Sequence, residues 1–312
     1  MGELQGVDIL SAGQFTREQI ELVLNTTAGI RRRRRDEQLK MYPGMILVTT
    51  FFEPSSRTRG SFQAAALRLG GGYIDMGSEK VSSLAKGEDF NDTIRTYDRL
   101  EPDVIVVRHP EIGSAQRAAD LARSPVINAG DGTNEHPTQG LLDLYTIWSL
   151  RKKKLEGLTI ALCGDLKNGR TVHSGVRFYS HFGCRLIFVS PDTLKMPTEI
   201  TEGLRSEDVS VVETSNLIAA MKVADVLYMT RIQKERFDNE SNYRKVSGSY
   251  ILTPEMVERV NRPKMLILHP LPRIDEIARG VDDLPNAVYF EQVRCGLYLR
   301  MALLALVSGR LS

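Results

Sequence analysis

The sequence has few cysteines and no long apolar run, and each shortage excludes a class of protein. Its three cysteines, Cys163, Cys184 and Cys295, are too widely spaced for a disulfide framework or a zinc site, so we interpret them as buried thiols. No apolar stretch approaches the roughly 20 residues of a membrane-spanning helix, and residues 1–4 lack the pattern of a signal peptide. These shortages predict a cytoplasmic protein without a membrane partner.

Charge of one sign is not in excess either. The net charge is +2, and 42% hydrophobic and 26% charged residues are typical of a globular protein. A nearly neutral chain is not a general nucleic-acid binder, so we expect no nucleic-acid partner and only local preferences for anions. The arginine run 31–35 could bind polyanions or act as a nuclear address, but we favour a solvated helix end.

Apolar segments alternate with helical patterns through both halves of the chain. This alternation predicts an α/β fold of two doubly wound parallel-sheet domains. We place the first domain at residues 1–142, completed by an amphipathic C-terminal helix at 291–307, and the second at 143–290. Ligands of such sheets bind beyond the carboxyl ends of the strands, so we expect the binding site at these ends.

The stretch Ser55-Ser56-Arg57-Thr58 follows the first predicted strand, at residues 45–52. A helical pattern follows at once and stops at the glycines 70–72. The unpaired N–H groups of a helix start, together with hydroxyls and an arginine, would form a pocket for a compact dianion such as phosphate. The alternative is an ordinary serine cap with exposed arginines.

Cationic and amide side chains follow several other predicted strands. Arg108 ends one strand, and His136 and Gln139 stand at the start of the helix after the next, where Pro137 fixes the backbone. In the second half, the groups that follow strands are Arg170, Arg231, Gln233 and the segment 269–273. We interpret His109 and His269, each before a proline, as structural residues.

Several catalytic signatures are missing. No His, Cys or carboxylate spacing suits a metal, and neither a dinucleotide fingerprint nor a P-loop occurs, so we expect no metal and no cofactor. No Ser-His-Asp or Cys-His arrangement provides a nucleophile. The pattern favours a reaction between two bound anionic substrates, in which positioning and charge stabilisation provide the catalysis.

Taken together, these motifs resemble the catalytic chain of the aspartate carbamoyltransferase (aspartate transcarbamylase) family over almost the whole length, from about residue 10 to 306. The segment Tyr228–Phe237 is similar to the version fused into the eukaryotic multifunctional pyrimidine-pathway protein. The motifs are Ser55–Arg59, Val107–Pro110, Asn128–Gly132, His136–Gln139, Gly164–Leu166, Thr230–Gln233 and His269–Arg273.

The resemblance implies transfer of the carbamoyl group of carbamoyl phosphate to L-aspartate, giving N-carbamoyl-L-aspartate and phosphate, in pyrimidine biosynthesis. It also implies a homotrimer with active sites in the cleft between the domains and at subunit interfaces, and other pathway enzyme domains on the same polypeptide as partners. Residues 1–142 would bind carbamoyl phosphate and residues 143–290 aspartate.

By the same resemblance, each motif residue has an expected role. Ser55, Ser56, Arg57 and Thr58 would hold the phosphate, and Arg108, His136 and Gln139 would face the carbamoyl group. Ser82 and Lys86 would come from the neighbouring subunit, Ser82 to bind carbamoyl phosphate, and Lys86, Arg170, Arg231 and Gln233 would bind aspartate. Leu271 and Pro272 would offer backbone carbonyls through a cis peptide bond. The catalytic residues would be Arg57, Thr58, Lys86, Arg108 and His136.

The sequence disfavours three alternatives to an aspartate carbamoyltransferase. A sister carbamoyltransferase for ornithine typically has cysteine where this chain has Pro270, and a cationic substrate calls for an acidic pocket in place of Arg231. A non-catalytic scaffold would have lost motif positions that are intact here, and an oxidoreductase lacks its fingerprint. We also expect the loop around Lys86 and the loop 238–249 to become ordered when ligands bind.

Overall fold

The structure is a computed structural model that describes residues 3–77, 87–232, 241, 246, 248 and 250–309. The chain forms two compact units, one of residues 1–145 and 294–312 and the other of residues 146–293. The sequence analysis predicts the boundary after residue 142 and assigns the C-terminal helix to the first domain. Each unit is described by itself.

The first unit is built on a parallel sheet of four strands in the order β2-β1-β3-β4. The strands are β1 (Ile46–Phe51), β2 (Gly72–Asp75), β3 (Val104–His109) and β4 (Val126–Asp131). The sequence order reverses between β1 and β3, where chain connections leave in opposite directions. Such a switch point is the place where open α/β sheets bind their ligands.

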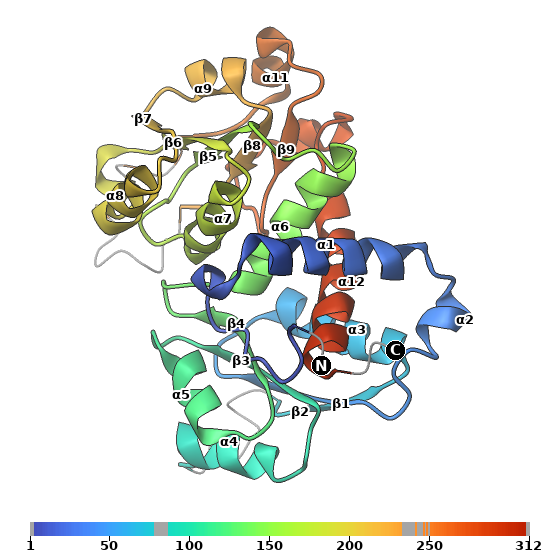
Figure 1. The fold of residues 1–312 in the computed structure, drawn as a ribbon. Coiled ribbons are helices and arrows are strands. Elements are labelled where there is room, and N and C mark those ends of the chain that lie inside the picture. The colour runs from blue at the N-terminus through green and yellow to red at the C-terminus, as the bar shows by residue number, and fades with distance from the viewer. Residues whose placement is uncertain are drawn as a thin grey trace. The chain divides into compact units, whose positions relative to one another are not determined.

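Helices lie on both faces of this sheet (Figure 1). One face is covered by α4 (Phe90–Asp98) and α5 (Ser114–Leu121), which pack Phe90, Ile94 and Ala118 on apolar residues of β1 and β3. On the other side lie α1 (Arg17–Arg32), α3 (Ser56–Leu69), α6 (Pro137–Leu150) and α12 (Tyr289–Val307). The remaining short helices are η1 (Ala12–Gln14) and α2 (Arg35–Gln38).

Two local signals explain where helices of this unit begin and end. Thr16 caps α1 by accepting from the Gln19 N–H at 3.3 Å, and Gln19 completes the capping box. Gly70 ends α3 in the left-handed conformation with φ 91°, and a Cβ at this position would lie 2.0 Å from the Leu39 carbonyl oxygen. The cap and the glycine stop predicted from the sequence are confirmed.

The second unit contains a parallel sheet of five strands in the order β7-β6-β5-β8-β9. The strands are β5 (Thr159–Cys163), β6 (Arg185–Val189), β7 (Val211–Thr214), β8 (Val226–Met229) and β9 (Leu266–Leu268). Its switch point lies between β5 and β8. With parallel sheets in both units, the predicted α/β fold class is confirmed. The predicted placement of the active site in a cleft stays a prediction.

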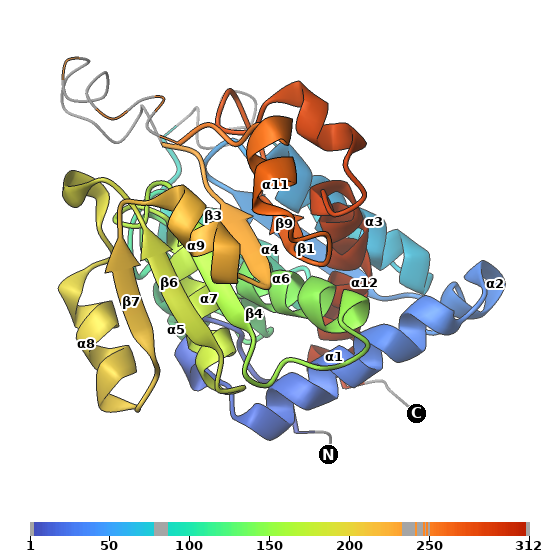
Figure 2. The same cartoon turned by 90° about the horizontal axis from the view of Figure 1, so that it is seen from above.

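Helices also lie on both faces of the second sheet (Figures 1 and 2). The face toward α9 (Leu217–Val223) and α11 (Pro254–Val260) buries Met221 and Val257 against strand residues such as Leu227. Beside the other face lie α7 (Arg170–Ser180) and α8 (Thr198–Ser206). Two short 3-10 helices, η4 (Asp192–Leu194) and η6 (Arg279–Asp283), complete the described elements. The sequence analysis did not predict α11, because seven residues give too short a periodic pattern.

The three cysteines are buried, as the sequence analysis predicted. Burial raises the pKa of the Cys184 thiol to about 12, and the neighbouring charges of Glu156 and Asp225 act in the same direction. Burial alone raises the pKa of Cys163. Among the described residues, no helix is both long enough and apolar enough to cross a membrane.

Candidate active site

The phosphate-binding stretch predicted from the sequence lies at the start of α3. Ser55 occupies the cap position, but within the described chain its side chain makes no capping hydrogen bond to the helix. The first turn contains no acidic residue, Ser56 and Arg57 are exposed, and Thr58 is buried. A helix start that offers N–H groups, hydroxyls and a cation, without an opposing carboxylate in its first turn, favours an anion. The ordinary serine-cap alternative does not describe this helix.

Arg108 is the last residue but one of β3, the strand next to β1, and is paired with Phe51, so it lies beside the segment that leads into α3. Its Nε donates to Glu53 Oε1 at 2.6 Å, and its Nη1 donates to the Ala129 carbonyl at 3.3 Å. Both partners of the Arg108–Glu53 ion pair are mostly buried, with 14% and 17% of their side chains exposed. A ligand that takes a hydrogen bond from Nε of Arg108 therefore has to compete with Glu53.

His136 and Gln139 stand at the start of α6. His136 is buried, and its Nδ1 lies 3.4 Å from the Thr138 hydroxyl. Gln139 is also buried; its backbone N–H donates to the His136 carbonyl at 2.9 Å, and its side-chain nitrogen donates to Asp143 Oδ1 at 2.8 Å. The two side chains are therefore held in place by the first turns of one helix.

The motif Asn128–Gly132 covers the last four residues of β4 and the residue after it. Asn128 Nδ2 donates to Asp131 Oδ1 at 3.0 Å, and Asn128 Oδ1 accepts from the Gly130 N–H at 2.7 Å. Asp131 also accepts from the Gly113 N–H at 3.0 Å and the Glu135 N–H at 3.1 Å. This network fixes the backbone immediately before His136, which explains why the motif has polar residues inside the unit.

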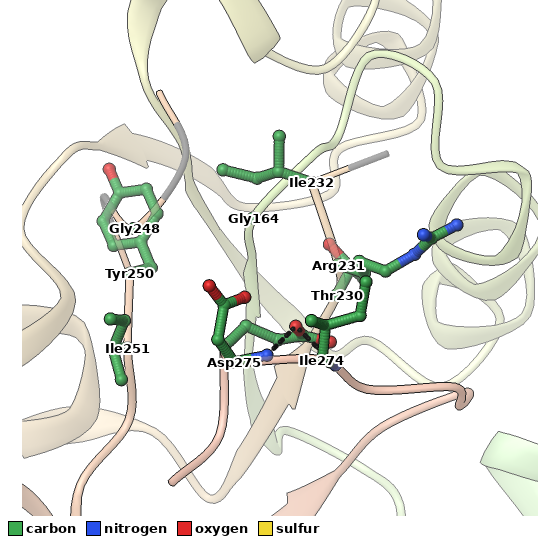
Figure 3. Close-up of a pocket in the computed structure, with 10 residues that line it drawn as sticks. Gly164, Thr230, Arg231, Ile232, Gly248, Tyr250, Ile251, Ile274 and Asp275 are labelled. Atoms are coloured by element: carbon green, nitrogen blue, oxygen red, sulfur yellow. Dashed lines mark hydrogen bonds between the residues drawn. The ribbon is translucent and has the colours of Figure 1, made fainter. Parts of the chain in front are cut away.

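In the second unit, the described residues include a pocket beyond the switch point (Figure 3). It is lined by Gly164 after β5, Thr230 and Arg231 after β8, Tyr250, and the segment 274–276 after β9. Gly164 has φ 122°, and a Cβ there would lie 2.3 Å from the Thr230 carbonyl oxygen, so only glycine allows this approach. The Arg231 side chain extends away from the Asp275 carboxylate (Figure 3).

The turn after β9 carries Leu271 and Pro272, which are joined by a cis peptide bond, as the sequence analysis predicted. The Leu271 N–H donates to His269 Nδ1 at 2.8 Å, and His269 Nε2 lies 2.6 Å from Glu276 Oε1. Burial by itself raises the pKa of Glu276, but hydrogen bonds and the nearby His269 outweigh it, so the pKa lies below the ordinary value. His269 thus has the structural role predicted for it, as a buried anchor of the turn.

His109 is also a structural residue. Its ring lies 5.0 Å from the ring centroids of both Phe52 and Phe90, in edge-on geometry, and its Nδ1 accepts from the Glu111 N–H at 3.0 Å. These contacts pack the half-buried ring against Phe52 after β1 and Phe90 of α4.

The structure therefore gathers Ser55, Ser56, Arg57, Thr58, Arg108, His136 and Gln139 at one edge of the first sheet. Arg170, Arg231, Leu271 and Pro272 gather at the corresponding edge of the second. Ser82, Lys86 and Gln233 lie outside the described residues, as do the loop around Lys86 and most of the loop 238–249. No group of side chains in the described ranges could hold a metal ion.

The sequence analysis missed three residues that hold these groups: Glu53, Asp143 and Glu276. Glu53 and Asp143 had a detectable signal, because one lies directly before Pro54 and the other lies one helical turn after Gln139.

Comparison with known proteins places the chain in a family. Sequence models described as "Aspartate/ornithine carbamoyltransferase" match twice, the carbamoyl-P binding domain over residues 7–149 and the Asp/Orn binding domain over residues 156–307. The chain belongs to this aspartate/ornithine carbamoyltransferase family.

Within that family, the chain is similar to aspartate carbamoyltransferases. It is 47% identical to the aspartate carbamoyltransferase catalytic subunit of Methanopyrus kandleri, over 99% of each chain. A Trypanosoma cruzi aspartate transcarbamoylase, solved with carbamoyl phosphate and aspartate, superposes with a TM-score of 0.92 at 40% identity over 98% of each chain. The catalytic subunit from M. jannaschii matches with a TM-score of 0.87 at 45% identity over 96% of each chain. The predicted resemblance to an aspartate carbamoyltransferase catalytic chain is confirmed.

Proposed function

We propose that this chain transfers the carbamoyl group of carbamoyl phosphate to the amine of L-aspartate, giving N-carbamoyl-L-aspartate and phosphate for pyrimidine biosynthesis. The observation that carries the proposal is that cations follow the switch-point strands of both sheets, in a chain matched end to end by aspartate carbamoyltransferases. The reaction and the enzyme class predicted from the sequence agree with these relatives, one of which was solved with carbamoyl aspartate and phosphate.

The first unit would bind carbamoyl phosphate. The phosphate dianion would accept hydrogen bonds from Ser55, Ser56, Arg57 and Thr58 at the start of α3, where the helix dipole favours negative charge. Arg108 and His136 would donate to the carbamoyl oxygen, and Gln139 would face the carbamoyl NH₂ group. The exposed position of Arg57 leaves it accessible to such a ligand.

The second unit would bind aspartate. Arg170, the first residue of α7, and Arg231 in the pocket would bind the two carboxylates, assisted by Gln233. Arginine suits this role because its planar guanidinium forms two parallel hydrogen bonds with a carboxylate. Carbonyl groups of Leu271 and Pro272 would accept from the amine of aspartate and from the carbamoyl group, because the anchored turn holds them in one orientation.

The proposed catalysis is positioning combined with charge stabilisation. Two anionic substrates repel each other, and the arginines offset that repulsion most strongly where water is excluded. As the amine attacks the carbamoyl carbon, Arg108 and His136 would stabilise the negative charge that develops on its oxygen. The C–O bond to phosphate then breaks, and the departing phosphate takes the proton of the amine, so no protein base is needed.

Assembly into a homotrimer would complete the site. Ser82 and Lys86 would be donated by the adjacent subunit, with Lys86 contacting both substrates. An interface is supported by two exposed apolar side chains on neighbouring elements, Leu67 on α3 and Tyr73 on the edge strand β2. A cytoplasmic location, and covalent linkage to other pyrimidine-pathway enzyme domains, remain proposals from the sequence.

A paired assay tests this function. Purified protein is supplied with carbamoyl phosphate and either L-aspartate or L-ornithine, and the carbamoylated amine is quantified. We expect turnover with aspartate and at least about 100-fold less with ornithine, because a cationic side chain meets Arg231 in place of an acidic partner. Turnover with ornithine alone would show a sister transferase, and turnover with neither amine would show a non-catalytic scaffold.

A further inference from the structure

Gln139 has an amide orientation that its neighbours determine. Its side-chain nitrogen donates to Asp143 Oδ1 at 2.8 Å, within the buried part of α6. An ionised carboxylate can only accept hydrogen bonds, so the NH₂ end of the amide must face Asp143. The carbonyl oxygen of Gln139 is then the end that remains for a ligand.

Asp143 is fully buried, so the hydrogen bond from Gln139 lies away from solvent. A hydrogen bond shielded from water holds its partners more firmly than an exposed one.

We propose that Asp143 is a positioning residue that holds Gln139 with its carbonyl oxygen toward the NH₂ group of the carbamoyl substrate. The inference rests on the proposed function. A Gln139 side chain turned over would present its own NH₂ to that of the substrate, so two donors would face each other without an acceptor. With the orientation fixed, the carbamoyl group is held at both ends, its oxygen by donors and its nitrogen by an acceptor.

A double-mutant cycle tests the proposal. Asp143→Ala, Gln139→Ala and the double variant are compared with the natural chain by kcat/KM for carbamoyl phosphate and by the dissociation constant of inorganic phosphate. We expect Asp143→Ala to lower kcat/KM by roughly 10- to 100-fold in the natural background and by less than about threefold when Gln139 is already alanine. Binding of inorganic phosphate should change less than about twofold, because phosphate has no NH₂ group for Gln139 to accept from.

Two further variants keep the cycle interpretable. Asp98 is a buried carboxylate of the same unit that accepts from the Arg123 and Ser124 N–H groups, so Asp98→Ala is a matched control. It should lower stability and leave kcat/KM for carbamoyl phosphate unchanged. If Asp143→Ala does not fold, Asp143→Leu, which also lacks an acceptor for the Gln139 amide, replaces it in the cycle with the same criterion.

Full additivity of the Asp143 and Gln139 losses, or an Asp143 variant with unchanged kcat/KM, would overturn the proposal. An equal loss in the Asp98 control would also overturn it, since any buried carboxylate would then have the same effect. A natural chain that carbamoylates no amine would instead contradict the proposed function, before any variant is made.

Discussion

The two sheets hold their ligand groups in different ways. At the edge of the first sheet the groups are charged or amide side chains, and buried side chains hold them: Glu53 pairs with Arg108, and Asp143 orients Gln139. At the edge of the second, a backbone turn is held by His269 and Glu276, and Arg231 stands beside it. The first site therefore depends on polar and charged side chains held in position, and the second on a backbone turn held in position.

This difference predicts different consequences of mutation. A change at the first edge removes an interaction with the substrate and leaves most of the packing intact, so activity should fall more than stability. A change in the anchor of the second edge releases a buried pair, so stability and activity should fall together.

Arg57→Ala is expected to have the largest effect on activity. Removing a charge partner of the phosphate from the start of α3 should cost at least about 3 kcal/mol of transition-state stabilisation, which is roughly a 150-fold loss in kcat/KM. The free energy of unfolding should change by less than about 0.5 kcal/mol, because Arg57 is exposed. Steady-state kinetics and urea unfolding measure the two quantities. Arg68→Ala in the last turn of the same helix is the control, and equal activity losses in both variants would contradict the prediction.

Glu276→Ala should affect stability and activity together. It leaves His269 buried without its carboxylate partner and frees two backbone N–H groups, so we expect a loss of about 3 kcal/mol in unfolding free energy. The Leu271 turn then loses its anchor, and kcat/KM for aspartate should fall by about 10- to 100-fold.

Exposed Asp275, the adjacent carboxylate, provides the control for this variant. Asp275→Ala keeps the His269–Glu276 pair and should leave the unfolding free energy within about 0.5 kcal/mol of the natural value. A Glu276→Ala variant of natural stability would remove the distinction between the two edges.

One carboxylate in each unit should contribute to the dependence of stability on pH. Burial by itself raises the pKa of Asp98 and of Glu276, but hydrogen bonds outweigh it, so both pKa values lie below their ordinary values of 3.8 and 4.5. A lowered pKa contributes stability above the unfolded value, and this contribution is lost as pH falls through the folded value. Stability should therefore fall steeply on the acid side of these values.

The variants Asp98→Asn and Glu276→Gln should each be less stable at neutral pH and show a shallower fall toward acid pH. Urea unfolding from about pH 7 down to about pH 2, which covers the acid side of these values, measures both slopes. Only the Glu276 variant should also lose activity at neutral pH, since Asp98 only caps the segment 123–124. Parallel slopes in all three chains would show that other groups govern acid unfolding.

Most of the fold was predictable because its signals are local. The apolar strands, the Thr16 capping box and the glycine stop of α3 each depend on a few adjacent residues, and each is found where the sequence predicts it. Short elements were harder. The seven residues of α11 carry fewer than three turns of periodicity, and its cap at Thr253 was not recognised.

The site was predictable in its contacts with ligands and not in its supports. Arginines and hydroxyls after strands can be recognised because the carboxyl ends of parallel strands share one edge. The partners of these groups come from distant parts of the chain, as Glu53 after β1 pairs with Arg108 of β3. Such pairings depend on which strands the fold places side by side, which no local pattern in the sequence records.

The smallest effects should come from helix caps, which both units use far from their ligand edges. Thr16 accepts from the Gln19 N–H at the start of α1, and Asn216 accepts from the Ala219 N–H at 3.0 Å at the start of α9. Replacing either by alanine leaves a helix N–H without its acceptor and should lower the unfolding free energy by about 1 kcal/mol. Neither cap lies in a segment that carries a ligand group, so kcat/KM for both substrates should stay within about twofold of the natural value. Equal losses of stability in the two variants, without a loss of activity, would show that the contrast between the sheets is confined to their ligand edges. A large loss of kcat/KM in the Asn216 variant would instead show that destabilising the second unit also disturbs the turn that carries Leu271 and Pro272.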